Sequence, residues 1–366
     1  MIKKYILLGV MASSLGSAAQ ASAAGRQADI TDISWEIGPN IPEFRKGSMA
    51  TVMGGKVISA FGMRQPWGEM DTTYIYDPVT NWWSRGPNGP IGQTYGEGTE
   101  LGNDYLAIGG RSKGLGGVHG KCYRLTFRGG QYRWSEIPSL NEARGWAPSA
   151  AVGKRAFVFG GGVGTMTGLQ TISSVEAWDS ANPKEPWKIV AAIPGLSRGW
   201  SSAAAVNGKI YLMGGSHFYP RQAGQPAKQP DRVQFNEVWE FNPETYEWKA
   251  KAALPYTLAG FDSCVYKDRY IIVAGGHAPK EGDFSREALE QWRGTKFHAA
   301  HYCPFVLVYD TKTDGWQRLP SLMPMPTNDI DLVIMGDRLY ALGGENKEPA
   351  TSNTTPWLRI GRINPK

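Results

Sequence analysis

The chain has 366 residues, of which 46 are glycine and 14 are tryptophan, and only 20% are charged. This composition favours many short strands joined by glycine turns. The formal net charge of +6 comes without a long basic run, which argues against a nucleic-acid partner.

The first 23 residues have the features of a secretory signal peptide. Two lysines precede a short apolar core, and two small-x-small cleavage sites follow it. We therefore expect a periplasmic or secreted protein and exclude residues 1–23 from the fold. Beyond them, no stretch approaches the ~20 apolar residues that a membrane span requires. We expect residues 24–366 to form a single domain.

An apolar strand that ends in glycine recurs six times along this domain. The copies are GKVISAFG (55–62), NDYLAIGG (103–110), KRAFVFGG (154–161), GKIYLMGG (208–215), DRYIIVAGG (268–276) and DRLYALGG (337–344). Their last glycines are 48 to 68 residues apart, and most copies are followed by a further strand and an aromatic tail such as TYIYDPVTNWW (73–83). The pattern resembles the kelch repeat, whose unit is one four-stranded propeller blade.

The resemblance implies an all-β fold, a six-bladed kelch-type β-propeller. The sixth unit is incomplete, because only one strand (356–363) follows its glycines before the chain ends. Residues 32–37, with Trp35 in the position of the aromatic tail, have the features of the missing outermost strand. We expect this N-terminal strand to close the ring and remove an open sheet edge.

Within each blade, the loop before the innermost strand and the loop after the glycines should emerge on one face. We name this end of the propeller axis the mouth. Residues 144–146 and 198–200 both read Arg-Gly-Trp, and arginine binds carboxylates through two parallel hydrogen bonds. We expect an anionic mono- or polysaccharide here, with packing between blades as the alternative. The substrate-binding candidates are Arg64, Arg144, Trp146, Arg198, Trp200, Arg221 and Asp262; the same loops supply Arg45, Lys46, Tyr95, Glu97, Arg111, Asn328, Asp329 and Asp331.

Candidate catalytic residues follow the glycines of the fourth and sixth units. His217, Tyr219 and Arg221 alternate, so they share one side of an extended loop. His217 and Tyr219 could exchange protons, and Glu345 follows the last Gly-Gly pair. An ordinary polar loop is the alternative for residues 214–222.

The longest insertion at the mouth spans residues 277–304. It should carry a short helix over 285–292 and act as a lid or wall. His277, His298, His301 and Cys303 could bind zinc, but their spacing matches no common zinc motif. We therefore expect no metal and no cofactor. The three cysteines are too few for a disulfide scaffold, and at least one thiol must be unpaired.

The chain also resembles the exported sialate (N-acetylneuraminate) mutarotase/epimerase family. The resemblance rests on six kelch units, the long insertion, the closing N-terminal strand and the Gly-Gly-Glu of residues 343–345. It implies that Glu345, with an arginine near the axis, transfers protons at the anomeric centre. Ser216 stands where the resemblance would imply an acid.

Two other functions remain open on the sequence. One is a polysaccharide lyase on a uronate-containing glycan, in which arginines neutralise the carboxylate and Tyr219 and His217 provide acid and base. The other is a non-catalytic propeller that binds glycans or proteins. A homodimer is an open alternative for the assembly.

Overall fold

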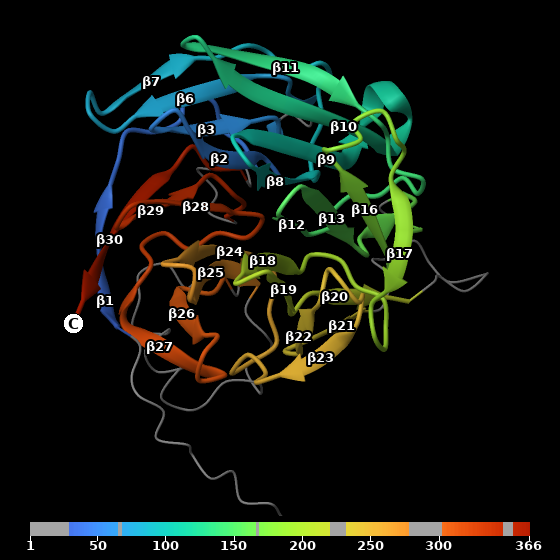
Figure 1. Cartoon of the computed structure of the whole chain (residues 1–366). Helices are drawn as coiled ribbons and strands as arrows, with labels where there is room; N and C mark the ends of the chain where they lie inside the picture. The colour runs from blue at the N-terminus through green and yellow to red at the C-terminus, as the bar shows by residue number, and fades with distance from the viewer. Residues whose placement is uncertain (1–28, 65–67, 166–167, 220–231, 278–301, 347–353) are drawn as a thin grey trace, which may run out of the picture.

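The computed structural model describes residues 29–64, 68–165, 168–219, 232–277, 302–346 and 354–366. Six four-stranded antiparallel sheets surround a central axis, with their first strands innermost (Figure 1). The six-bladed propeller expected from the repeats is thus confirmed. Among the described residues, no helix has the length and apolar character needed to cross a membrane.

The first three blades follow one another in chain order. Blade 1 contains β2 (Met49–Met53), β3 (Lys56–Ala60), β6 (Thr73–Asp77) and β7 (Trp82–Arg85). Blade 2 contains β8 (Glu97–Leu101), β9 (Asp104–Ser112), β10 (Gly117–Arg128) and β11 (Gln131–Ile137). Blade 3 contains β12 (Ser149–Val152), β13 (Arg155–Phe159), β16 (Ser174–Asp179) and β17 (Lys188–Ala192).

The other three blades complete the ring. Blade 4 contains β18 (Ser202–Val206), β19 (Lys209–Met213), β22 (Val238–Phe241) and β23 (Trp248–Lys251). Blade 5 contains β24 (Ala259–Tyr266), β25 (Tyr270–His277), β26 (Phe305–Asp310) and β27 (Gly315–Leu322). Blade 6 contains β28 (Asp331–Met335), β29 (Arg338–Leu342), β30 (Leu358–Pro365) and β1 (Ile30–Ile37).

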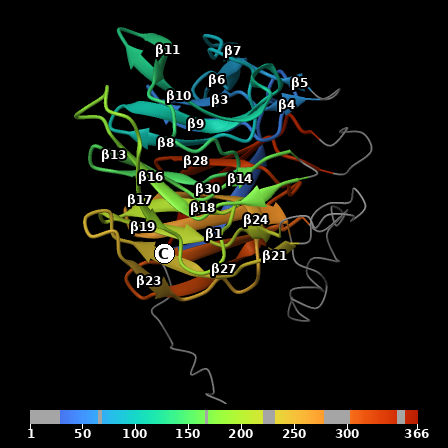
Figure 2. The same cartoon turned by 90° about the vertical axis from the view of Figure 1, so that its right-hand side faces the viewer.

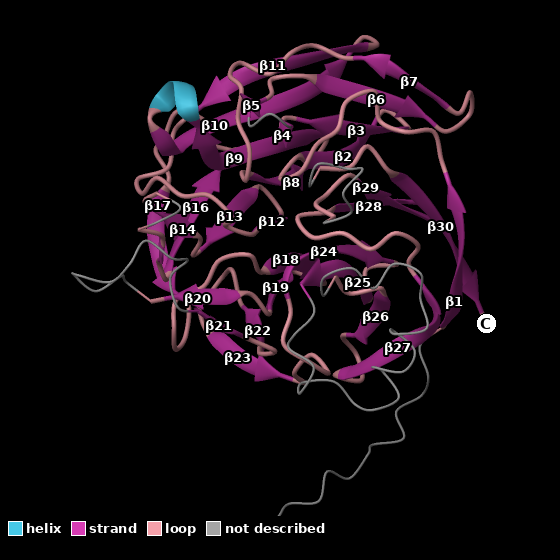
Figure 3. Cartoon of the chain, turned by 180° about the vertical axis from the view of Figure 1, so that it is seen from behind, coloured by secondary structure: helices cyan, strands magenta, loops and turns pink. Residues whose placement is uncertain are grey.

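The N-terminal strand closes the ring, as the sequence predicts. β1 pairs antiparallel with β30, and Trp35 lies opposite Gly361. The N-terminal and C-terminal strands lie side by side at the rim in opposite views (Figures 1 and 3). The pairing gives β30 a partner on its outer side, so the sixth blade presents no unpaired edge there.

Short ribbons extend the loops that follow the second strand of several blades. They pair β4 (Met63–Arg64) with β5 (Gly68–Glu69), β14 (Gly162–Val163) with β15 (Gln170–Thr171), and β20 (Ser216–Phe218) with β21 (Arg232–Gln234). In the side view, β4 and β5 lie beyond β3 and β6 on one side of the ring (Figure 2). A 3-10 turn, η1 (Lys113–Leu115), joins β9 to β10 (Figure 3).

Tryptophans in or next to the outer strands connect neighbouring blades. The indole nitrogens of Trp83, Trp187 and Trp316 each donate to a backbone carbonyl of the segment before their own blade, at 2.9, 2.9 and 2.8 Å. Trp187 is only 1% exposed. Burying such a ring stabilises the packing while its one polar atom stays hydrogen-bonded. The aromatic tails of the repeat therefore serve packing between blades.

Candidate functional site

Six residues linked by five backbone hydrogen bonds surround the axis at the mouth. They occupy equivalent positions at or just before the start of each innermost strand and all have a left-handed backbone: Gly47 (φ 54°), Tyr95 (54°), Trp146 (53°), Trp200 (54°), Gly260 (67°) and Asp329 (50°). From Tyr95 onward, each amide donates to the carbonyl of the preceding member at 2.7–3.0 Å. We name these six residues the mouth ring.

Aromatic side chains stack along blades 2 to 4 of the mouth ring. The centroid distances are 4.7 Å for Tyr95–Trp146, 4.6 Å for Trp146–Trp200 and 4.7 Å for Trp200–Phe218. A left-handed backbone costs a residue with a Cβ roughly 1–2 kcal/mol, so this stack and the backbone bonds must hold it in place. Because the rings cover one another, Trp146, at 4% exposed, offers no free face for stacking on a sugar.

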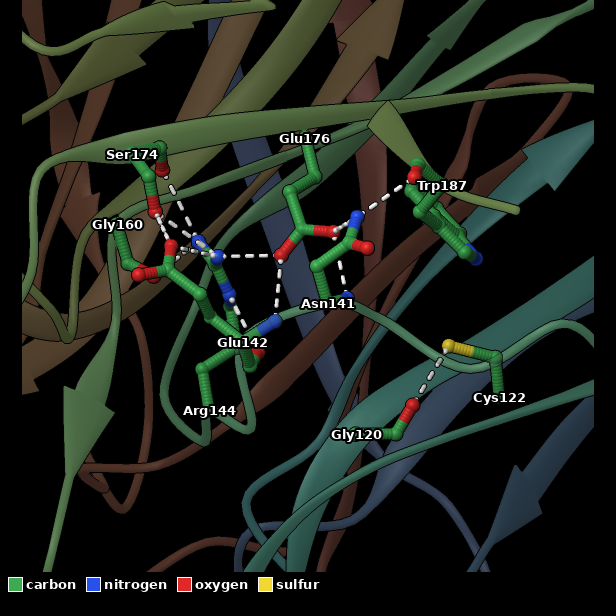
Figure 4. Close-up of polar contacts among 9 residues, drawn as sticks. All are labelled: Gly120, Cys122, Asn141, Glu142, Arg144, Gly160, Ser174, Glu176 and Trp187. Carbon is green, nitrogen blue, oxygen red and sulfur yellow. Dashed lines mark hydrogen bonds and ion pairs between the residues drawn. The ribbon is translucent and has the colours of Figure 1, made fainter. Parts of the chain in front are cut away.

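The two Arg-Gly-Trp arginines are buried within the propeller. Arg144 is fully buried and donates to the carbonyls of Gly160 and Ser174 at 2.9 and 3.0 Å (Figure 4). It also forms ion pairs with Glu176 at 2.6 Å and Glu142 at 3.1 Å. Burial lowers the pKa of Arg144, and the two glutamates oppose that shift. The guanidinium thus ties the mouth loop to the glycines of the same blade.

The same arrangement recurs in other blades. Arg198 is fully buried, donates to the Gly214 carbonyl at 3.4 Å and pairs with Glu237 at 2.6 Å. Arg45 donates to the Phe61 carbonyl at 3.3 Å in blade 1. In blade 6 the arginine comes from β30, where Arg359 donates to the Gly343 carbonyl at 2.9 Å. These contacts account for the repeated arginine without a ligand.

His217 and Tyr219 lie together on the blade 4 loop. His217 Nδ1 lies 3.0 Å from Thr171 Oγ1 and 2.9 Å from the Ser197 carbonyl. The Tyr219 ring is 45% exposed and meets the His217 ring edge-on at 4.6 Å. Arg221 lies outside the described residues.

The remaining sequence candidates make other contacts. Arg64 is half-exposed and pairs with Glu43 at 3.1 Å. His277 Nδ1 lies 2.6 Å from Asn328 Oδ1. Cys303 is buried 3.3 Å from the Tyr256 hydroxyl, and burial raises its thiol pKa to about 11. His298, His301 and the expected helix over 285–292 lie outside the described residues. In the described part, no three His, Cys, Asp or Glu side chains are grouped to hold a metal.

Glu345 joins three blades at the mouth. Its Oε2 pairs with Lys46 Nζ of blade 1, and its Oε1 accepts a hydrogen bond from the Tyr302 hydroxyl of blade 5 at 3.0 Å. Its backbone exchanges two bonds with Asn328 at 3.0 and 2.6 Å. The Glu345 side chain is 18% exposed, whereas Tyr302 is 1% exposed. The carboxylate is therefore oriented from two sides yet reachable from the mouth.

Asp329 of the mouth ring adds a second carboxyl group beside Glu345. It is partly exposed and lines a cavity of about 40 Å³ together with Tyr95, Trp200 and Asp331. Burial, and next the charge of Glu345, raise the pKa of Asp329 to about 7, while Lys46 opposes the shift. A cavity of this size holds water but no sugar ring.

Below the mouth ring, four carboxyl groups line a cavity of about 330 Å³: Glu97, Glu100, Asp262 and Asp331. Asp262 accepts bonds from the Leu332 amide at 2.8 Å and the Ser202 hydroxyl at 3.2 Å, which links blades 4, 5 and 6. Burial raises the pKa of Asp262 to about 6, that of Asp331 to about 7 and that of Glu97 well above its usual range. Asp262 thus lies inside the axis rather than at its rim.

Comparisons with known proteins give one family and two kinds of relative. The profile of the KLHDC2/KLHL20/DRC7 Kelch-repeats domain matches residues 92–344. The chain is 23% identical over 292 residues to human Kelch repeat and BTB domain-containing protein 12, covering 75% of this chain and 42% of the relative.

The other relatives are bacterial. N-acetylneuraminate epimerase of Escherichia coli O9:H4 (strain HS) is 24% identical over 218 residues, covering 52% of this chain and 57% of that protein. The protein of the same name from Brucella suis is 26% identical over 247 residues, covering 63% and 59%. The chain thus spans about half the length of the curated relatives it matches.

Proposed function

Because the chain belongs to the kelch-repeat family of β-propellers, we propose that its mouth binds an anionic sugar of the sialate class and interconverts the two anomers. The observation that carries the proposal is Glu345, a partly exposed carboxylate held by Lys46 and Tyr302 where three blades meet. The relatives named N-acetylneuraminate epimerase support this substrate class.

Interconversion of anomers needs only proton transfers. A base removes the proton of the anomeric hydroxyl, an acid protonates the ring oxygen, and the bond from the anomeric carbon to that oxygen breaks. The carbonyl that forms can rotate before the ring closes on its other face. Glu345 serves as one of these groups, with Tyr302 holding Oε1 in place and Lys46 balancing the charge at Oε2.

Cationic side chains around the mouth support an anionic substrate. Arg111, which is 31% exposed, pairs with Glu69 at 2.8 Å, and Arg64, which is 54% exposed, pairs with Glu43. A substrate carboxylate could compete with these acids for a guanidinium.

We also propose export, on the basis of the leader over residues 1–23; N-terminal sequencing of the protein recovered from the periplasm or medium would test it.

Anomer exchange by NMR tests the function directly. We expect the protein to accelerate exchange of N-acetylneuraminate and Glu345→Gln to lower kcat by roughly 10²–10⁴-fold. Glu244→Gln is a matched control, since Glu244 is 75% exposed and lies on a surface turn, and it should keep full activity. A folded wild-type protein that leaves the exchange rate unchanged would rule the proposal out.

A uronate lyase is the second candidate, favoured by the contact between His217 and the exposed Tyr219. Such an enzyme would create a double bond that absorbs in the ultraviolet. If wild type cleaves a uronate polymer and Tyr219→Phe or His217→Ala abolishes cleavage while Glu345→Gln does not, the lyase replaces the mutarotase. Glycan binding with neither activity would leave the non-catalytic propeller.

A further inference from the structure

Asp329 occupies a unique position in the mouth ring. The other five members are glycines or aromatic residues, so Asp329 alone brings a carboxyl group. Its backbone is fixed by a hydrogen bond from its amide to the Gly260 carbonyl at 2.9 Å. Aspartate is one of the few side chains that tolerate a left-handed backbone. The residue thus presents a carboxyl group at the mouth on a rigid support.

The surroundings of Asp329 pair it with Glu345. Asn328, its neighbour in sequence, exchanges two backbone bonds with Glu345, and Lys46 contacts the Glu345 carboxylate. The other titratable groups coupled to these two carboxyl groups come from blades 2, 5 and 6: Tyr95, Glu97, Tyr302 and Asp331.

Two carboxyl groups in one site favour sharing a single proton, because both cannot ionise at little cost. The two differ in their partners. Glu345 is paired with a lysine through one carboxyl oxygen and accepts a hydrogen bond from Tyr302 at the other. Asp329 lines the small cavity inside the mouth ring, and burial together with the Glu345 charge raises its pKa to about 7. Near neutral pH, Asp329 therefore retains a proton for much of the time, while Lys46 and Tyr302 hold the Glu345 side chain in place.

We propose that Asp329 is the general acid that works with Glu345 as general base, an inference that rests on the function proposed above. In ring opening, the Asp329 proton goes to the ring oxygen, Glu345 takes the proton of the anomeric hydroxyl, and the carbon–oxygen bond of the ring breaks. In closure on the other face, Glu345 returns its proton to the carbonyl oxygen and the chain hydroxyl returns one to Asp329. Protons and electrons balance without a co-reactant.

The pH dependence of kcat separates this role from a structural one. Wild-type kcat should fall as pH rises through the pKa of Asp329. Asp329→Asn keeps the size of the side chain and its tolerance of this backbone; we expect kcat to drop roughly 10²–10⁴-fold, with KM little changed and the alkaline decline lost. Asp268→Asn is the matched control, because Asp268 has φ of 45° in the turn between β24 and β25, and it should stay within about twofold of wild type.

A second variant covers the case in which Asp329→Asn does not fold. Lys46 lowers the pKa of Asp329, so Lys46→Met should move the alkaline decline of kcat to higher pH. Wild-type kcat and an unchanged pH profile in a folded Asp329→Asn protein would overturn the assignment, as would an unshifted decline in Lys46→Met. Wild type without mutarotase activity would overturn the proposed function itself, and this inference with it.

Discussion

The two halves of the mouth share one backbone and differ in what they carry. In blades 2 to 4 the mouth ring bears Tyr95, Trp146 and Trp200, which stack on one another. In blades 5, 6 and 1 it bears Gly260, Asp329 and Gly47. The aromatic half uses its side chains for packing. The other half has no aromatic residue in the mouth ring, which leaves room for Glu345, Lys46 and Tyr302. A repeated fold can thus place its chemistry in the units that depart from the repeat.

The arginine of the aromatic half gives the largest expected effect. Arg144→Ala would leave Glu176, which is fully buried, without its cation. Removing one partner of a buried ion pair costs about 3–5 kcal/mol, so urea denaturation should show a loss of that size. Arg64→Ala, at the exposed rim, is the control and should change stability by no more than about 0.5 kcal/mol. If Arg144→Ala had wild-type stability and only bound the sugar more weakly, Arg144 would instead be a residue that binds the ligand.

Much of the fold could be predicted from the sequence, because the same local sequence pattern recurs six times. The glycine pair and the tryptophan tail are local features, and the ring closure follows from the strand missing in the last unit. The fate of Arg144 and Arg198 depends on Glu176 and Glu237, which lie 32 and 39 residues away in sequence. The periodicity of the sequence does not predict that these glutamates contact the arginines.

Tyr302 illustrates the same limit in the candidate site. It lies within the long insertion and reaches Glu345 across 43 residues of sequence. Glu345, Lys46 and Asp329 are predicted to lie at one mouth by their positions in the repeat, but Tyr302 lies in an insertion that the repeat pattern does not include. Its tyrosine could be assigned only after the strands were placed in space.

One step below the mouth ring, carboxyl groups from several blades predict a dependence of stability on pH. Blades 5 and 6 carry Asp262 and Asp331 at a position where blade 2 carries Glu97 and blades 3 and 4 carry Pro148 and Ser202. The folded-state pKa values of these two aspartates are raised to about 6 and 7, above the unfolded value. Their stabilising protonation is therefore fully present below about pH 4 and is lost as pH rises through 6 to 7.

We expect the free energy of unfolding to be lower at pH 8 than at pH 5, by about 1–3 kcal/mol from these groups. Asp331→Asn should reduce that difference, because the amide does not ionise. Asp337→Asn, in an exposed turn, should leave it unchanged. Urea titrations at both pH values measure the effect. An equal change in the free energy of unfolding between pH 5 and pH 8 in wild type and Asp331→Asn would contradict it.

The smallest expected effect is on stability, and it tests whether the aromatic stack requires a glycine at position 47. A Cβ on Gly47 would lie 2.5 Å from Tyr95 Cδ1, in a backbone with φ of 54°. Gly55, in the turn between β2 and β3, has φ of 72° and nothing within 4 Å of its Cβ position. Gly55→Ala should therefore cost only the backbone strain of roughly 1–2 kcal/mol. Gly47→Ala should cost about 1 kcal/mol more, because the Tyr95 ring must shift along its stack. Near-UV circular dichroism should change in Gly47→Ala alone, and equal stabilities with identical spectra would show that the two halves are independent.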